Sequence, residues 1–114
     1  MATRRFFLKP AIKLADAEWF TVIAALFREG SSPARKLRDK LLAETRAGRQ
    51  VRLVQFLTGR AATSHAIQAK LGMSRRTFFR DLSDLETHGT EFTLGEGFQY
   101  QIARLPKSLK DFGR

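Results

Sequence analysis

Cysteine is absent from the 114-residue sequence, and histidine occurs only twice, as His65 and His88. Disulfides and thiolate metal sites are therefore excluded, and we expect neither a metal site nor a cofactor. No apolar run approaches the ~18 residues that a membrane-spanning helix needs. The N-terminus also lacks the continuous apolar core and the cleavage site of a secretory signal. We therefore expect a cytoplasmic protein with no membrane partner.

Acidic residues are scarce: eleven Asp and Glu stand against 21 Lys and Arg, which gives a formal net charge of +10. Such a balance favours a polyanionic partner, above all nucleic acid, although a merely soluble basic protein or an anionic-membrane binder also fits it. The acidic residues are scattered, and no Ser/His/Asp set has a supporting context. We therefore expect a binding protein rather than an enzyme.

Proline is rare as well, and two of its three occurrences mark breaks near the N-terminus. Pro10 is incompatible with a helix interior, so residues 5–14 are expected to be extended. Ser32 followed by Pro33 is typical of a helix start, with Ser32 as the N-cap. Gly48 is expected to close that helix. The short loop around Gly48 is then the one plausible boundary within the chain.

The part before this boundary, residues 1–48, contains a first helix that we expect to start at an Asp16 N-cap and to end at Gly30. Its apolar residues cover more than half of its circumference. A small domain buries such a surface either by packing it deeply or by giving part of it to a partner. Core packing and a homodimer interface are equal alternatives, and an adaptor surface for a larger protein is a third. These apolar residues are Trp19, Phe20, Val22, Ile23, Leu26 and Phe27.

Residues 49–105 show three helices followed by an alternating hairpin. The first helix covers residues 50–57, the second is short and capped by Thr63, and the third covers residues 74–88. Helix, short helix, tight glycine turn, longer helix and hairpin is the order of a winged helix-turn-helix. The predicted fold class is mainly α with a β-hairpin wing (α+β), preceded by a two-helix extension. Residues 106–114 are expected to form a frayed basic tail.

The helix over residues 74–88 separates an apolar face from a basic one. With Phe78 directed inward, a rotation of about 100° per residue places Arg76 and Arg80 on the outward face. Arg75 lies at the N-terminus, where the helix dipole already favours a phosphate, and Ser74 can cap the helix and meet a phosphate oxygen. This pattern predicts a recognition helix that enters the major groove of DNA.

The stretch TSHAIQAKLGMSRRTFFRDLSDLETHG resembles the N-terminal winged helix-turn-helix of DeoR-like and WYL-domain transcription regulators. The resemblance implies sequence-specific binding to double-stranded DNA, usually as a homodimer, in a small bacterial or phage-type regulator associated with the nucleoid. Because the sequence ends soon after the wing, we expect no C-terminal sensor domain and no small-molecule effector. The matching positions are Leu71, Gly72, Met73, Ser74, Arg75, Arg76, Thr77, Phe79, Arg80, Asp81, Leu82, Leu85, Glu86 and Gly89.

The same resemblance implies which residues contact DNA. Position 79 holds Phe where the family more often has Tyr. Arg104, after the wing, could reach the DNA backbone or simply be solvated, whereas Glu96 at the wing turn argues against a phosphate contact by the tip. The candidate DNA-binding residues are Ser74, Arg75, Arg76, Thr77, Phe79, Arg80, Thr63 and Arg104.

Overall fold

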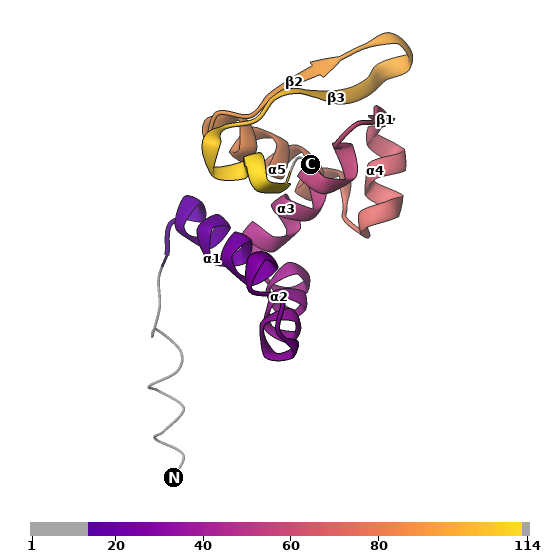
Figure 1. Cartoon of the computed structure of the whole chain (residues 1–114). Helices are drawn as coiled ribbons and strands as arrows, with labels where there is room; N and C mark the ends of the chain where they lie inside the picture. Colours follow the sequence, from indigo (N-terminus) through magenta and orange to yellow (C-terminus); the bar gives the residue numbers. More distant parts are fainter. Residues whose placement is uncertain (1–13, 113–114) are drawn as a thin grey trace.

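The computed structural model describes residues 14–112, in which helices form most of the structure and a small sheet follows them (Figure 1). Of the segment 5–14 that was expected to be extended, residues 5–13 lie outside the described part. The helices are α1 (Asp16–Glu29), α2 (Ser32–Glu44), α3 (Arg46–Leu57), α4 (Ser64–Leu71) and α5 (Arg75–Thr87). The strands are β1 (Ala62–Thr63), β2 (Glu91–Leu94) and β3 (Gln99–Arg104), and short 3-10 turns are η2 (Glu96–Phe98) and η3 (Lys107–Phe112).

Helices α3, α4 and α5, followed by the hairpin β2–β3, form a winged helix-turn-helix, and α1 and α2 precede it. The predicted fold class, mainly α with a β-hairpin wing, is confirmed. The sequence did not predict β1, which pairs antiparallel with β3 and gives the strand order β1-β3-β2. Only Ala62 and Thr63 form this strand, and two residues are too few to show an alternating pattern.

The first two helices each begin one residue earlier than a reading of their polar residues suggested. Ala15, not Asp16, is the N-cap of α1, and the Glu18 carboxylate accepts the Ala15 backbone N–H at 2.8 Å. Ser31, not Ser32, caps α2, because its hydroxyl accepts the backbone N–H of Ala34 at 3.3 Å. Ser31 and Ser32 are chemically equivalent caps, so the local sequence alone could not choose between them, whereas the alanine cap of α1 departs from the usual preference for Asp or Ser.

Gly48 does not close the second helix, and that prediction was wrong. Helix α2 ends at Glu44, and Thr45 is both its C-cap and the N-cap of α3. The Thr45 hydroxyl donates to the Leu41 carbonyl at 2.6 Å and accepts the Gly48 N–H at 2.9 Å. Gly48 lies buried in the first turn of α3, so the expected boundary falls inside a helix.

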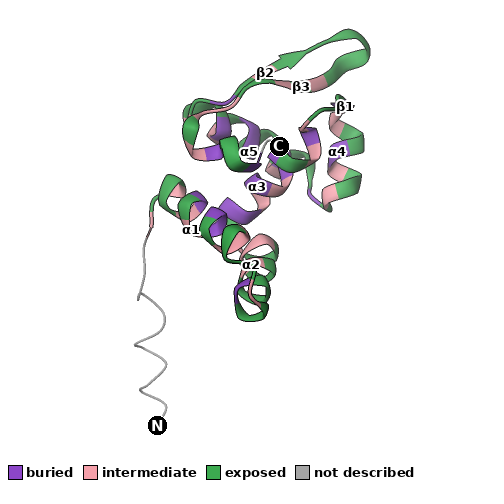
Figure 2. Cartoon of the chain, viewed as in Figure 1, coloured by how far each residue is buried: buried purple, intermediate pink, exposed green. Residues whose placement is uncertain are grey.

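The apolar face of α1 packs into the core that α1, α3, α4 and α5 share (Figure 2). Phe20 and Ile23 are fully buried, and Trp19 and Phe27 are half-buried against the same cluster. Of the three alternatives posed for α1, core packing accounts for Phe20 and Ile23. From α3 and α5 the fully buried apolar side chains are Val51, Leu53, Val54, Leu57, Phe78 and Leu85.

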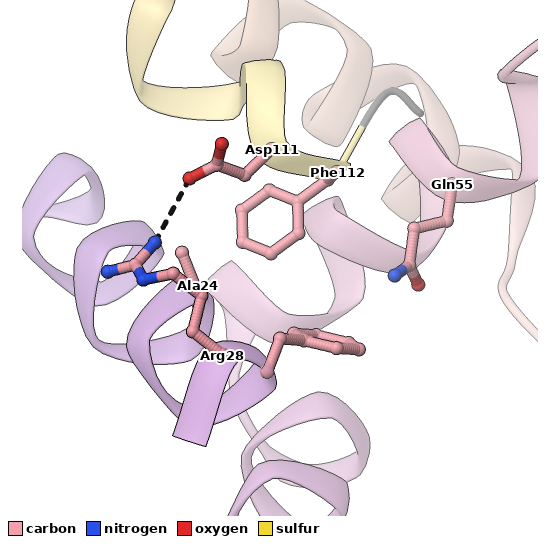
Figure 3. Close-up of a pocket in the computed structure, with 6 residues that line it drawn as sticks. Ala24, Arg28, Gln55, Asp111 and Phe112 are labelled. Carbon is pink, nitrogen blue, oxygen red and sulfur yellow. Dashed lines mark hydrogen bonds and ion pairs between the residues drawn. The ribbon is translucent and has the colours of Figure 1, made fainter. Parts of the chain in front are cut away.

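The segment after the wing is ordered up to Phe112, so the expected frayed tail was wrong over residues 106–112. Leu109 is fully buried, and the ring of Phe112 lies 5.9 Å from that of Phe27, in an edge contact. Figure 3 shows Phe112 between α1 and α3, beside the ion pair of Arg28 with Asp111. Most residues of this segment are polar or charged, but the apolar Leu109 and Phe112 are three positions apart, so a 3-10 turn places both on the same side.

Candidate nucleic-acid interface

The turn between α4 and α5 is fixed by capping at each step. The Thr63 hydroxyl accepts the backbone N–H of Ala66 at 3.2 Å and so starts α4. Gly72, with φ of 65°, ends α4 in the left-handed conformation that glycine adopts without a steric cost. The Ser74 hydroxyl accepts the Thr77 N–H at 3.1 Å and starts α5. Both caps and the glycine turn agree with the sequence prediction.

Helix α5 presents one buried and one exposed face, as its helical phase predicted. Phe78, Leu82 and Leu85 are buried in the core. Thr77 is half-buried, because its side chain turns towards the Ser74 hydroxyl, 3.1 Å away. The exposed residues at the start of this helix and on its outer face are Ser74, Arg75, Arg76, Phe79, Arg80 and Ser83. A basic surface and the N–H groups of a helix N-terminus therefore lie together, which suits a phosphate backbone.

A buried carboxylate holds α5 against α3. The Asp81 side chain is completely buried and accepts hydrogen bonds from Nε and Nη2 of Arg49, the latter at 2.8 Å. The Gln50 amide donates to the carboxylates of both Asp81 and Asp84, at 3.4 and 3.3 Å. The hydrogen bond to Asp81 raises the pKa of Arg49 above its ordinary value. The positive charge of Arg49 on α3 is thus balanced by a carboxylate of α5. The arginines of α5 itself remain exposed to solvent.

Sequence reasoning missed Arg49, whose partner is 32 residues away in the chain. The helical phase of α5, with Phe78 directed inward, places Asp81 towards the core, which indicates a structural contact rather than a catalytic one. No local pattern on α3 distinguishes Arg49 from its neighbours Arg46 and Arg52. The pair becomes evident only when α3 and α5 are packed together.

The C-terminal end of α5 is tied to α1. His88, the C-cap residue, lies with Nε2 3.1 Å from an Asp16 carboxylate oxygen. The rings of Phe20 and His88 make an edge-to-face contact, with their centres 6.0 Å apart. Both ends of the helix are therefore held by neighbouring elements, the N-terminal end by its turn and the C-terminal end by α1.

Phe79 is exposed on α5, between the arginines of the basic face. Its side chain is 38% exposed, and its ring lies 4.9 Å from the buried ring of Phe78. Phe78 in turn contacts Tyr100 of β3, with ring centres 5.4 Å apart. The guanidinium of Arg75 lies over the Phe79 ring, 5.5 Å from its centre.

The two remaining candidates, Arg104 and Thr63, lie outside α5. Arg104 pairs with Glu91 at 3.7 Å, at the base of the wing, close to where α5 ends. Thr63 lies in β1, opposite Gln99 of β3. Phe98 lies in the η2 turn at the wing tip, where its side chain is exposed and its φ is 57°. Of the candidate residues, those exposed on α5 lie together with the N-terminus of that helix.

The pocket between α1, α3 and η3 offers no comparable set of free polar groups (Figure 3). Its two charged side chains, Arg28 and Asp111, are 3.2 Å apart and form an ion pair. The other lining residues are Ala24, Phe27, Gln55 and Phe112. Over residues 14–112, no helix is both long and apolar enough to cross a membrane.

No protein-family model, curated protein or solved structure matches the chain. Its fold and the geometry of α5 therefore carry the functional argument.

Proposed function

We propose that this protein binds double-stranded DNA in a sequence-specific manner, as a transcription regulator, with α5 in the major groove. The observation that carries the proposal is the surface of α5: a Ser74 cap, three exposed arginines, and a buried face clamped to α3 through Asp81. The rigid attachment matters because base readout requires side chains to start from a fixed helix.

The exposed residues of α5 have two different roles in DNA binding. Ser74, Arg75 and the first N–H groups of α5 face the phosphate backbone and set the register of the helix. Arg76 and Arg80, one turn apart, are spaced to present their guanidinium groups to the base edges, where bidentate contact to guanine is the commonest specific contact of Arg. Most of the affinity comes from phosphate contacts, and sequence choice comes from these two arginines.

Replacing Arg76 or Arg80 with alanine is expected to weaken binding to the preferred duplex by about 1–3 kcal/mol each. The loss should be larger for that duplex than for a scrambled one, because base contacts disappear. Arg35→Ala is the matched control, since Arg35 is equally exposed but lies on α2. Fluorescence anisotropy at fixed salt measures all three variants. Equal, small effects of the three substitutions on folded protein would contradict the recognition role of α5.

Selection of bound sequences from a random duplex library identifies that preferred site. A homodimer presents two copies of α5 related by a two-fold axis, so the selected motif is expected to be palindromic, with half-sites one helical turn apart, about 34 Å. A single non-palindromic motif would support a monomer that still reads DNA. A library without enrichment would contradict sequence-specific binding.

An adaptor that docks another protein through α1 is the second candidate function. Phe20 and Ile23 are buried in the core, which reduces the apolar surface of α1 that is left for such docking. Salt separates the two candidates: the logarithm of the DNA association constant should fall linearly and steeply with the logarithm of salt concentration, because counterions are released from the phosphates. Salt concentrations of 50 and 200 mM differ about fourfold. Binding that hardly changes between these two concentrations would instead support an apolar docking contact.

A further inference from the structure

One apolar side chain stands on the basic surface of α5. Among residues 14–112, the large apolar side chains that are clearly exposed are Leu37, Phe79, Leu94 and Phe98. Leu37 belongs to α2, and Leu94 and Phe98 belong to the wing. Phe79 is therefore the one such side chain on α5 within the described residues, and the DNA-binding proposal for the arginines leaves it without a role.

The surroundings of Phe79 hold its ring in place. The fully buried Phe78 supports one side of the ring, and Phe78 is itself fixed by Tyr100 of β3. The guanidinium of Arg75 covers another part of the ring, at a distance typical of a cation–π contact. What remains exposed is a rigid apolar surface with arginine on its flank, and such a surface loses little side-chain entropy when it binds.

The charges beside Phe79 select the class of partner. Arg75, Arg76 and Arg80 surround it with positive charge, which favours a polyanion over an apolar protein surface. Of the groups that the four base pairs display in the major groove, the 5-methyl group of thymine is the apolar one, and aromatic side chains are known to contact it. An exposed phenylalanine on a groove-reading helix matches that group in polarity, because both are apolar.

We propose that Phe79 reads a pyrimidine 5-methyl group in the major groove, next to the base pairs that the arginines of α5 contact. The proposal rests on the proposed DNA-binding function and names the feature of the duplex that this site selects. Thymine carries the methyl group in ordinary DNA, and 5-methylcytosine displays the same group at the same position of the ring. Uracil and cytosine lack it.

The experiment removes the methyl group from the DNA and its contact from the protein, separately and together. Each thymine of the site selected by the unaltered protein is replaced in turn by uracil, and binding is measured for the unaltered protein and for Phe79→Ala. At one position, uracil should weaken binding of the unaltered protein about fourfold, the effect of one buried methyl group. The same replacement should leave Phe79→Ala unchanged.

Two further DNA arms and one further variant make the result specific. At the sensitive position, 5-methylcytosine should bind about fourfold more tightly than cytosine, which shows that the methyl group rather than the A·T pair is read. Phe79→Leu keeps an apolar side chain and should retain part of the preference. Because each result is a ratio of two duplexes for one protein, a change in the folded fraction of a variant does not affect it.

The failures of the two proposals are distinguishable. If the unaltered protein enriches a site whose thymines all tolerate uracil, or whose uracil effect is equal in Phe79→Ala, methyl reading is overturned and DNA recognition stands. If the unaltered protein enriches no site, sequence-specific recognition fails, and methyl reading fails with it.

Discussion

Replacing Gly48 with alanine is expected to lower the free energy of unfolding by about 3 kcal/mol or more. Intrinsic helix propensity predicts the opposite sign, because alanine is favoured over glycine inside a helix by about 1 kcal/mol. The structure reverses the sign because a Cβ at Gly48 would lie 2.1 Å from the Leu41 carbonyl oxygen and 2.6 Å from the Leu42 Cα. Both are backbone atoms, so no side-chain rotation relieves the overlap and α2 must move away from α3.

Gly59→Ala is the matched control for this substitution. Gly59 has a positive φ of 70°, and a Cβ there would meet nothing within 4 Å. Its replacement costs only the left-handed conformation, about 1–2 kcal/mol. Urea denaturation followed by circular dichroism gives both values. A Gly48→Ala variant as stable as the unaltered protein, or more stable, would contradict the close approach of α2 and α3.

Gly48 also shows where a reading of the sequence fails. A glycine after an amphipathic stretch is the usual sign of a helix end, and Gly30 and Gly72 fit that rule. Gly48 is used for a different property, its lack of a side chain where two helices nearly touch. The sequence contains no mark that separates these two uses, because the second depends on a contact between elements rather than on the chain around the glycine.

The features of α5 could be predicted because their causes are local. Its cap at Ser74, its phase and the inward position of Asp81 all follow from residues within one or two turns. The features that were missed depend on distant partners: β1 exists because β3 offers it hydrogen bonds, and η3 is ordered because Phe27 and the core accept Phe112. Local patterns thus indicate which face of α5 is exposed but not what holds the helix in place.

Replacing Arg49 with alanine is expected to lower the free energy of unfolding by about 3–5 kcal/mol. The Asp81 carboxylate is completely buried and would keep only the amide of Gln50 as a partner. A buried carboxylate without its counter-charge is far more costly than the ion pair is favourable. Asp81→Asn should cost less, because Arg49 is 30% exposed and can be hydrated.

Arg46→Ala provides the matched control, because Arg46 belongs to the same helix and pairs with Asp84 of the same partner helix. Its side chain is half exposed, so its loss should cost about 1 kcal/mol or less. Thermal and urea unfolding of the three variants test the difference. Equal losses of stability in Arg49→Ala and Arg46→Ala would mean that water reaches Asp81 readily and that the Arg49–Asp81 pair holds α3 and α5 together only weakly.

The same variants test whether the contact of Arg49 with Asp81 serves the proposed DNA recognition as well as stability. Arg49 and Arg46 both lie on α3, so loss of positive charge alone should affect the two variants similarly, through long-range attraction to phosphates. A looser α5 should instead reduce discrimination between the selected duplex and a scrambled one, because base contacts depend on the orientation of Arg76 and Arg80. We expect that reduction in Arg49→Ala, measured well below its unfolding temperature, and not in Arg46→Ala. Unchanged discrimination in folded Arg49→Ala would show that the turn and the His88 contact with α1 suffice to orient α5.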